Sequence, residues 1–226
     1  MALVRHDSRE VQFKIVYCGP SGGGKTTSLS YIHRRLDPAL RGDLVSIATE
    51  RNRTICFDFL PVHETLVAGY RTRFQLYAVP GQRMLAETRR SVLAGADGIV
   101  FVADSSRSRL TANAEAWTGC REALAANRID PDRVPVAYQY NKRDQAGAIA
   151  PEDLDELFQV RNPSFLSCAV SGYQVFAALD WVIGGVLSGF HASLTTRKRC
   201  RTGTEMEETV PGVARRAGRA SGVAVP

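Results

Sequence analysis

The chain has few cysteines, and their spacing forms no framework. Five cysteines occur among 226 residues, at positions 18, 56, 120, 168 and 200, and no two of them make a CxxC pair. An odd number at wide spacing argues against a disulfide scaffold and against a structural zinc site. The pattern is typical of reduced thiols, so we expect a cytoplasmic protein.

The sequence also lacks a long unbroken apolar run and an apolar segment near its start. A membrane helix needs roughly 18–20 consecutive apolar residues, and no uninterrupted stretch reaches that length. Residues 5–10 are polar, and the four apolar residues before them are too few for the apolar region of a signal peptide. We therefore expect neither a transmembrane segment nor a secretory signal. The 44% of hydrophobic residues is ordinary for a globular domain and excludes a wholly disordered chain.

A basic excess is missing from most of the chain, although the net charge is +6. Residues 196–226 carry seven Lys or Arg and three Glu, which leaves 22 basic and 20 acidic residues elsewhere. Such a balanced body does not predict nucleic-acid binding. We expect an N-terminal extension (1–10), a globular domain (11–192) and a basic, disordered tail (193–226). Cys200 lies within the basic segment of residues 197–201. For this segment we favour a solvated tail over peripheral contact with a membrane.

Apolar, β-rich segments alternate with segments of helical pattern. Strands are predicted at residues 11–18, 55–60, 70–79, 98–103, 134–140 and 164–168. Helices are predicted at residues 26–36, 111–127, 151–158 and 172–190. This alternation predicts an α/β P-loop NTPase fold of three layers, with a mostly parallel sheet of six to seven strands and helices on both faces.

The strongest local signal matches the pattern G-x-x-x-x-G-K-[ST] directly after the first predicted strand. Its glycines let backbone N–H groups surround a phosphate, and the helix that follows adds unpaired donors. Lys25 can reach the β- and γ-phosphates, and the Thr26 hydroxyl can bind Mg²⁺. The predicted phosphate-binding residues are Gly19, Ser21, Gly22, Gly23, Gly24, Lys25, Thr26 and Thr27.

A second motif, Asn141-Lys142-Arg143-Asp144, follows the strand predicted at residues 134–140. The Asp144 carboxylate can accept hydrogen bonds from N1–H and from the exocyclic amine of guanine, and adenine offers neither donor. Because an unpaired buried polar group is costly, this residue predicts guanine selectivity. Asn141 can brace the loop, and the Lys142 side chain can lie over the base. An ATP-dependent P-loop kinase stays a weaker alternative, which Asp144 opposes.

These motifs resemble those of the Ras-like small GTPase superfamily. Three further stretches are similar to the bacterial gliding-motility GTPases of the MglA family: residues 48–61 (ATERNRTICFDFLP), 76–82 (LYAVPGQ) and 138–144 (YQYNKRD). The resemblance covers about residues 10–190. It implies a GTP-binding molecular switch that hydrolyses GTP, in cell polarity or gliding motility. It also implies a homodimeric Roadblock/LC7-type activating protein as partner, with effectors that it does not name.

The resemblance also implies roles for individual residues. Thr54 matches the switch I threonine that senses the γ-phosphate and Mg²⁺, so Thr26 and Thr54 form the implied metal site. Arg53 matches an arginine finger supplied in cis, and Gln82 matches the residue that orients the attacking water. Gly81 matches the switch II glycine that meets the γ-phosphate. Cys168 and Ala169 occupy the last guanine-binding loop, where the Ala169 amide is implied to contact guanine O6.

Two departures from the family pattern bear on hydrolysis. Ala78 occupies the switch II position where Ras-like proteins have a metal-supporting Asp, and Ser21 occupies a P-loop position that is usually Gly. We hypothesise that nucleotide binding is kept while unassisted hydrolysis is slow. The alternative is a nucleotide-binding regulatory scaffold with little or no hydrolysis.

Overall fold

The computed structural model describes residues 2–5, 7–49, 52–59, 66–67, 69–79 and 86–204. Its strands are β1 (Leu3–Arg5), β2 (Glu10–Cys18), β3 (Val45–Thr49), β4 (Asn52–Phe59), β5 (Leu66–Val67), β6 (Tyr70–Ala78), β7 (Gly98–Asp104), β8 (Val136–Asn141) and β9 (Ser164–Leu166). Its helices are α1 (Lys25–Arg35), α2 (Ala86–Leu93), α3 (Leu110–Ala126), α4 (Pro151–Phe158) and α5 (Val175–Thr204), with 3₁₀ turns η1 (Pro38–Leu40) and η2 (Arg107–Arg109).

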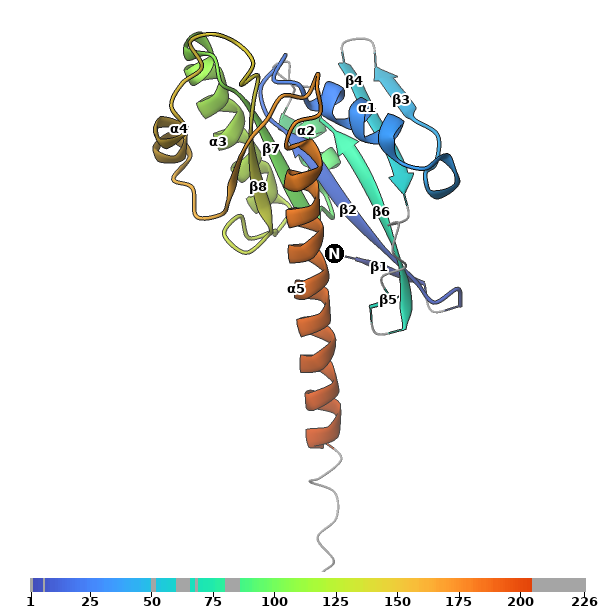
Figure 1. The fold of residues 1–226 in the computed structure, drawn as a ribbon. Helices are drawn as coiled ribbons and strands as arrows, with labels where there is room; N and C mark the ends of the chain where they lie inside the picture. The colour runs from blue at the N-terminus through green and yellow to red at the C-terminus, as the bar shows by residue number, and fades with distance from the viewer. Residues whose placement is uncertain are drawn as a thin grey trace, which may run out of the picture. The chain divides into compact units, whose positions relative to one another are not determined.

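The described strands form one sheet in the order β3-β4-β6-β2-β7-β8-β9, while β1 pairs with β2 and β5 pairs with β6. The pairs β6–β2, β2–β7, β7–β8 and β8–β9 are parallel, and β3–β4 and β4–β6 are antiparallel. Parallel neighbours end at the same edge of the sheet, so the loops after β2, β7 and β8 lie together (Figure 1). The predicted mostly parallel α/β fold is confirmed.

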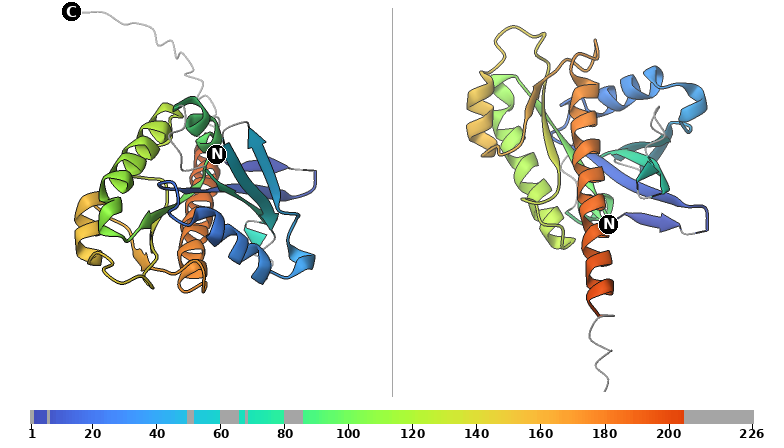
Figure 2. Two further views of the ribbon diagram at one scale, coloured as in Figure 1. Left: turned by 90° about the horizontal axis from the view of Figure 1, so that it is seen from above. Right: turned by 60° about the horizontal axis from the view of Figure 1, so that its bottom comes forward.

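Helices cover both faces of this sheet, as Figure 2 shows. On one face, Leu29 and Ile32 of α1 and Leu179 and Val182 of α5 pack against apolar side chains of the central strands. On the other face, α2, α3 and α4 contribute a second core, which includes a cluster of aromatic side chains: Phe101, Trp117, Tyr138 and Phe158. Every residue of β7 is buried, which explains the unbroken apolar run of residues 98–103 that precedes Asp104.

Several described elements were not predicted: the strands β1, β3 and β5, helix α2 and the 3₁₀ turns η1 and η2. The segment of residues 41–54, which ends at the implied switch I threonine Thr54, contains β3 and the first residues of the antiparallel β4. Its Val, Ile and Thr residues favour extended backbone, and pairing with β6 through β4 supplies the hydrogen bonds that a short segment cannot make alone. Helix α2 was also missed: it has eight residues, like α4, but no proline in its first turn marks its start.

The chain divides into two units, Met1–His191 and Ala192–Pro226. Within the second unit, helix α5 continues to Thr204, beyond residue 193 where the tail was expected to begin, and the disorder of the tail stays a prediction. Residues 192–202 contain Ala, Leu, Lys and Arg and neither Gly nor Pro, a composition that favours helix. Residues 205–226 lie outside the described part of the chain.

One described helix is long and apolar enough to cross a membrane by length and composition. This stretch, Val175–Thr195, has a mean hydropathy of 1.5. Core helices of soluble proteins meet the same criterion, and Val175, Leu179 and Val182 pack in the core described above. The absence of a transmembrane segment therefore stays a prediction.

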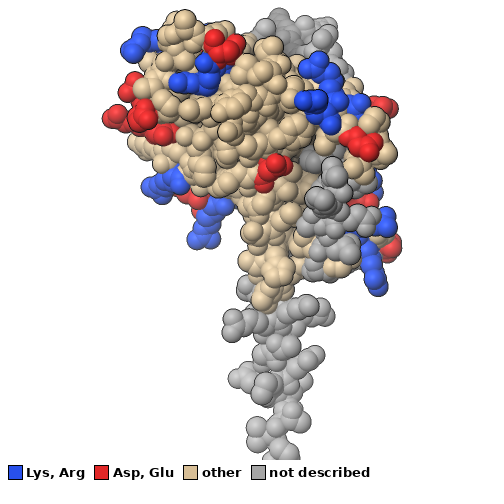
Figure 3. Space-filling view, viewed as in Figure 1, with Lys and Arg blue, Asp and Glu red and all other residues tan. Residues whose placement is uncertain are grey.

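Charges of both signs are interspersed on the described surface of the face drawn in Figure 3. Lys and Arg side chains lie beside Asp and Glu, and the described residues of this face form no continuous basic patch. This distribution agrees with the balanced charge of the body of the chain, and the absence of a nucleic-acid partner stays a prediction.

Candidate functional site

The loop from β2 to α1 has a backbone that demands glycine. Gly19 and Gly24 have φ angles of +135° and +104°, a region that other residues rarely adopt. A Cβ on Gly19 would lie 2.1 Å from the carbonyl oxygen of Val102, and one on Gly24 would lie 2.0 Å from Nδ2 of Asn141. Gly19 and Gly24 are therefore required by both conformation and packing.

Lys25, the first residue of α1, folds its ammonium group back over this loop. Its Nζ atom donates to the carbonyl oxygens of Gly19 at 2.8 Å and Pro20 at 2.6 Å. The pKa of Lys25 is lowered to about 8, mainly by burial; the charge of Cys18 raises it and the positive charge of Arg109 lowers it. A buried cation that contacts neutral carbonyl groups is poised to gain from an anion.

The first turn of α1 adds further groups suited to an anion. Thr26 and Thr27 are exposed, and the first turn contains no acidic residue. The N–H groups at a helix start lack intrahelical partners and carry a partial positive charge. Together with Lys25, this end of α1 can hold phosphate oxygens.

Asn141 connects the phosphate loop to the loop of Cys168 and Ala169, which is the last of the predicted guanine-binding loops. It ends β8, and its Nδ2 donates to the carbonyl oxygen of Gly23 at 2.7 Å. Its Oδ1 accepts from the Ala169 amide at 2.8 Å. These two contacts fit the bracing role predicted for Asn141, and its part in nucleotide binding stays a prediction. The Ala169 amide, implied to meet guanine O6, donates to Asn141 in this structure, so its contact with the base stays a prediction.

Lys142 lies in the left-handed region, with φ of +66°, and its ammonium donates to Oδ2 of Asp104 at 2.7 Å. Asp104 ends β7 and is 2% exposed. Burial by itself raises the pKa of Asp104, but hydrogen bonds from Lys142 and Ser106 outweigh this effect and hold the pKa below its usual value. The side chain predicted to lie over the base is therefore held by a buried carboxylate.

Asp144 lines an open hollow of about 600 Å³ beside the last loop. The other lining residues are Arg143, Cys168, Val170, Ser171 and Tyr173. Asp144 is exposed, and its carboxylate is available to a ligand that enters this hollow. Val170 and Tyr173 are 78% and 61% exposed, and such large apolar surfaces suit the faces of a planar base.

Four predicted site residues cannot be compared with the structure. Gly81 and Gln82 lie outside the described residues. Arg53 and Thr54 belong to β4, but the positions of their side chains lie outside the described part. Their roles stay predictions. Ala78, the residue that departs from the switch II pattern, is 1% exposed in the core, so this position of β6 supplies no polar group.

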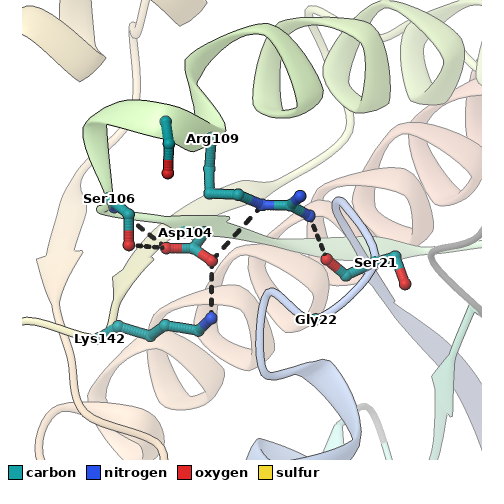
Figure 4. A pocket seen from close by; sticks show the side chains of 7 residues that line it. Ser21, Gly22, Asp104, Ser106, Arg109 and Lys142 are labelled. Carbon is teal, nitrogen blue, oxygen red and sulfur yellow. Dashed lines mark hydrogen bonds and ion pairs between the residues drawn. The ribbon is translucent and has the colours of Figure 1, made fainter.

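The predicted site residues include neither Arg109 nor Asp104. Both line a second hollow of about 440 Å³ with Ser21, Gly22 and Lys142 (Figure 4). A lone arginine in a 3₁₀ turn carries no motif, so no signal in the sequence pointed to Arg109. Asp104 offered one signal, its position at the carboxyl end of a buried strand where ligands bind.

The phosphate loop after β2 (residues 19–24) is joined by Asn141 to an acidic base-reading loop after β8 (residues 141–144). Together these two loops define a Ras-like small guanine-nucleotide-binding protein. The comparisons with known proteins agree. The chain is 41% identical over 189 residues to the mutual gliding-motility protein MglA of Myxococcus xanthus, which covers 83% of this chain and 97% of that protein.

More distant relatives are the Ypt/Rab-type GTPases ypt7 of Pyricularia oryzae and Rab7 of Neurospora crassa. Each is 27% identical over 137 residues, which is 60% of this chain and 60% of the relative. No family model matches the chain. The chain belongs to the MglA family of Ras-like small GTPases. This membership makes it a GTP-binding GTPase and disfavours a scaffold without hydrolysis.

The lowered pKa of Lys25 predicts a pH dependence of nucleotide affinity. A bound phosphate is anionic and raises this pKa above its free value of about 8, so binding favours the protonated amine. Affinity for GDP should be flat below pH about 8 and should fall above it, by up to about tenfold per pH unit. Titration calorimetry in buffers of different ionisation enthalpy should also show proton uptake near pH 8. An affinity that stays level across this range would contradict the role of Lys25.

Proposed function

We propose that the chain is a GTP-operated switch of bacterial cell polarity or gliding motility. The observation that supports a switch most directly is the pair of contacts made by Asn141, at 2.7 Å to Gly23 and 2.8 Å to Ala169. They hold the phosphate loop and the base-reading loop as one unit, so a single nucleotide can contact both. The proposed process comes from the name of the Myxococcus relative, which is a gliding-motility protein.

The proposed metal is Mg²⁺, held by the hydroxyls of Thr26 and Thr54 and by phosphate oxygens. Thr26 fits this role because it is exposed on the first turn of α1, directly after Lys25. Hydroxyl and phosphate oxygens are ligands that Mg²⁺ prefers. When bound, the ion neutralises charge on the β- and γ-phosphates. Because Ala78 offers no carboxylate, the metal depends on these two threonines and on water.

In the proposed hydrolysis, Gln82 orients the attacking water and Arg53 neutralises charge on the transferring phosphoryl group. Thr54 and the Gly81 amide hold the two switches against the γ-phosphate. Loss of that phosphate removes the contact and releases the switches, which effectors then distinguish. Ser21 beside the γ-phosphate and Ala78 are proposed to keep unassisted turnover slow.

The proposed partner is a homodimeric Roadblock/LC7-type activating protein, and the proposed compartment is the cytoplasm. The described cysteines Cys18, Cys120 and Cys168 are free thiols, which suits a reducing compartment. Effectors would contact the switches and the tail.

A single-turnover assay of GTP hydrolysis tests the switch directly. The nucleotide that co-purifies should be GDP or GTP, and added Roadblock protein should accelerate hydrolysis. Arg53→Ala and Gln82→Leu are each expected to slow the stimulated rate by about 100-fold or more while GDP affinity is kept. Arg107→Ala, an exposed arginine of η2, serves as the control. Equal rates for all these proteins would reject the assigned hydrolytic roles.

A further inference from the structure

The start of the phosphate loop is a tight turn whose central peptide can adopt two orientations. The Gly23 amide donates to the Pro20 carbonyl oxygen at 3.2 Å, so Ser21 and Gly22 are the central residues. Gly22 has a φ angle of +74°, the value of a type II turn. A type I turn has a negative φ at this position, and the two types differ by a flip of the Ser21–Gly22 peptide. Because Gly22 permits both signs of φ, the loop itself does not select one.

Arg109 contacts this peptide from a distant part of the chain. Its Nη2 donates to the carbonyl oxygen of Ser21 at 2.5 Å, across 88 positions of sequence (Figure 4). The Ser21 carbonyl is thereby held toward Arg109. In a planar trans peptide the N–H of the next residue points opposite to the carbonyl. The Gly22 amide therefore points away from Arg109.

The arginine is itself attached to a fixed carboxylate. Its Nε lies 3.8 Å from Oδ2 of Asp104, the same oxygen that accepts from Lys142. Ser106 donates twice to the other oxygen, from its amide at 3.0 Å and its hydroxyl at 2.7 Å. Asn113 pairs with the backbone of Asp104 through both of its amide atoms, at 3.0 and 2.8 Å. Asp104 therefore has little freedom to move, and it can set the position of Arg109.

We propose that Arg109 is a positioning residue for nucleotide binding. By holding the Ser21 carbonyl outward, it selects the turn in which the Gly22 amide points into the phosphate loop and donates to a phosphate oxygen. Through Asp104 and Lys142, the same arginine ties the phosphate loop to the base-reading loop. This inference rests on the proposed guanine-nucleotide site. Arg109 itself need not touch the nucleotide.

The test compares Arg109→Ala with Arg107→Ala, an exposed arginine of the same 3₁₀ turn. Arg109→Ala should weaken GDP binding about tenfold, mainly through faster dissociation, since it removes a charge-assisted hydrogen bond that orients one phosphate donor. Arg109→Lys keeps a cationic donor and should recover part of the affinity. Arg107→Ala should bind like the unmodified protein. The preference for GDP over ADP should not change, because Asp144 is untouched.

A spectroscopic measurement separates this role from a general structural one. In ¹H–¹⁵N spectra of the GDP complex, the Gly22 amide resonance should shift in Arg109→Ala toward its position in the nucleotide-free protein, and it should stay in place in Arg107→Ala. An Arg109→Ala protein with normal GDP dissociation, or with an unmoved Gly22 resonance, would overturn the inference. Failure of the unmodified protein to bind GDP would instead refute the proposed function.

Discussion

Replacing Asp144 with Asn is expected to transfer the preference of the protein from guanine to xanthine nucleotides. The carboxylate accepts from N1–H and from the 2-amino group of guanine, whereas an amide presents a donor that suits the 2-oxo group of xanthine. Affinity for GDP should fall by about 10⁴-fold, the scale on which sites that lose a required hydrogen bond discriminate. Competition between GDP and XDP for a fluorescent nucleotide measures the change.

The exposed Asp144 carboxylate has a matched control in Asp153 of α4, which is also exposed. Asp153→Asn makes the same chemical change away from the hollow beside the last loop and should leave both affinities as they were. If Asp144→Asn kept its preference for GDP over XDP, the guanine-reading role of Asp144 would be wrong. The assignment of the phosphate-binding loop would be unaffected, because the contacts of that loop do not involve the Asp144 side chain.

Replacing Lys25 with Ala is expected to lower affinity for GDP and GTP by about 1000-fold. The buried ammonium now contacts the carbonyl oxygens of Gly19 and Pro20, and a phosphate offers it a full opposite charge. Hydrogen bonds to charged groups contribute roughly 1.5–3 kcal/mol each, and two such contacts account for the expected loss. Isothermal titration or dissociation of a fluorescent GDP analogue measures it.

Arg34 provides the control for this second substitution because it is exposed on the same helix. Arg34→Ala should bind nucleotide normally. Thermal melting of both variants without nucleotide separates lost binding from lost folding. A Lys25→Ala protein that is folded and binds GDP within a few-fold of normal would contradict the assignment of the phosphate site, in which the Lys25 ammonium contacts a phosphate.

Several elements could be predicted because their causes are local. The apolar run of β7 is continuous because both faces of the strand are covered, and the glycine pattern of residues 19–24 records a backbone that other residues rarely adopt. The motif that begins at Asn141 could be placed because it follows a strand directly. By contrast, β3 depends on pairing with β4, and no single-segment pattern predicts pairing.

Many residues of the candidate site could also be predicted from its motifs. The hydrogen bonds that join these residues to one another could not. Lys25, Asn141 and Asp144 are recognisable because each belongs to a short pattern with a known chemical purpose. A bracing role was predicted for Asn141, but its partner Gly23 lies 118 positions away, and neither residue type predicts that pairing. Arg109 belongs to no pattern, and its importance appears once its distance to the Ser21 carbonyl is known.

The amino-acid sequence by itself determined the class of this protein: a phosphate loop, a guanine-reading loop and an α/β alternation, each encoded by neighbouring residues whose backbone and side-chain chemistry act locally. The tertiary structure decided how these parts are joined. Asp104, Arg109 and Asn141 act across long sequence separations, because hydrogen-bond partners are selected by the packing of the sheet and not by position along the chain.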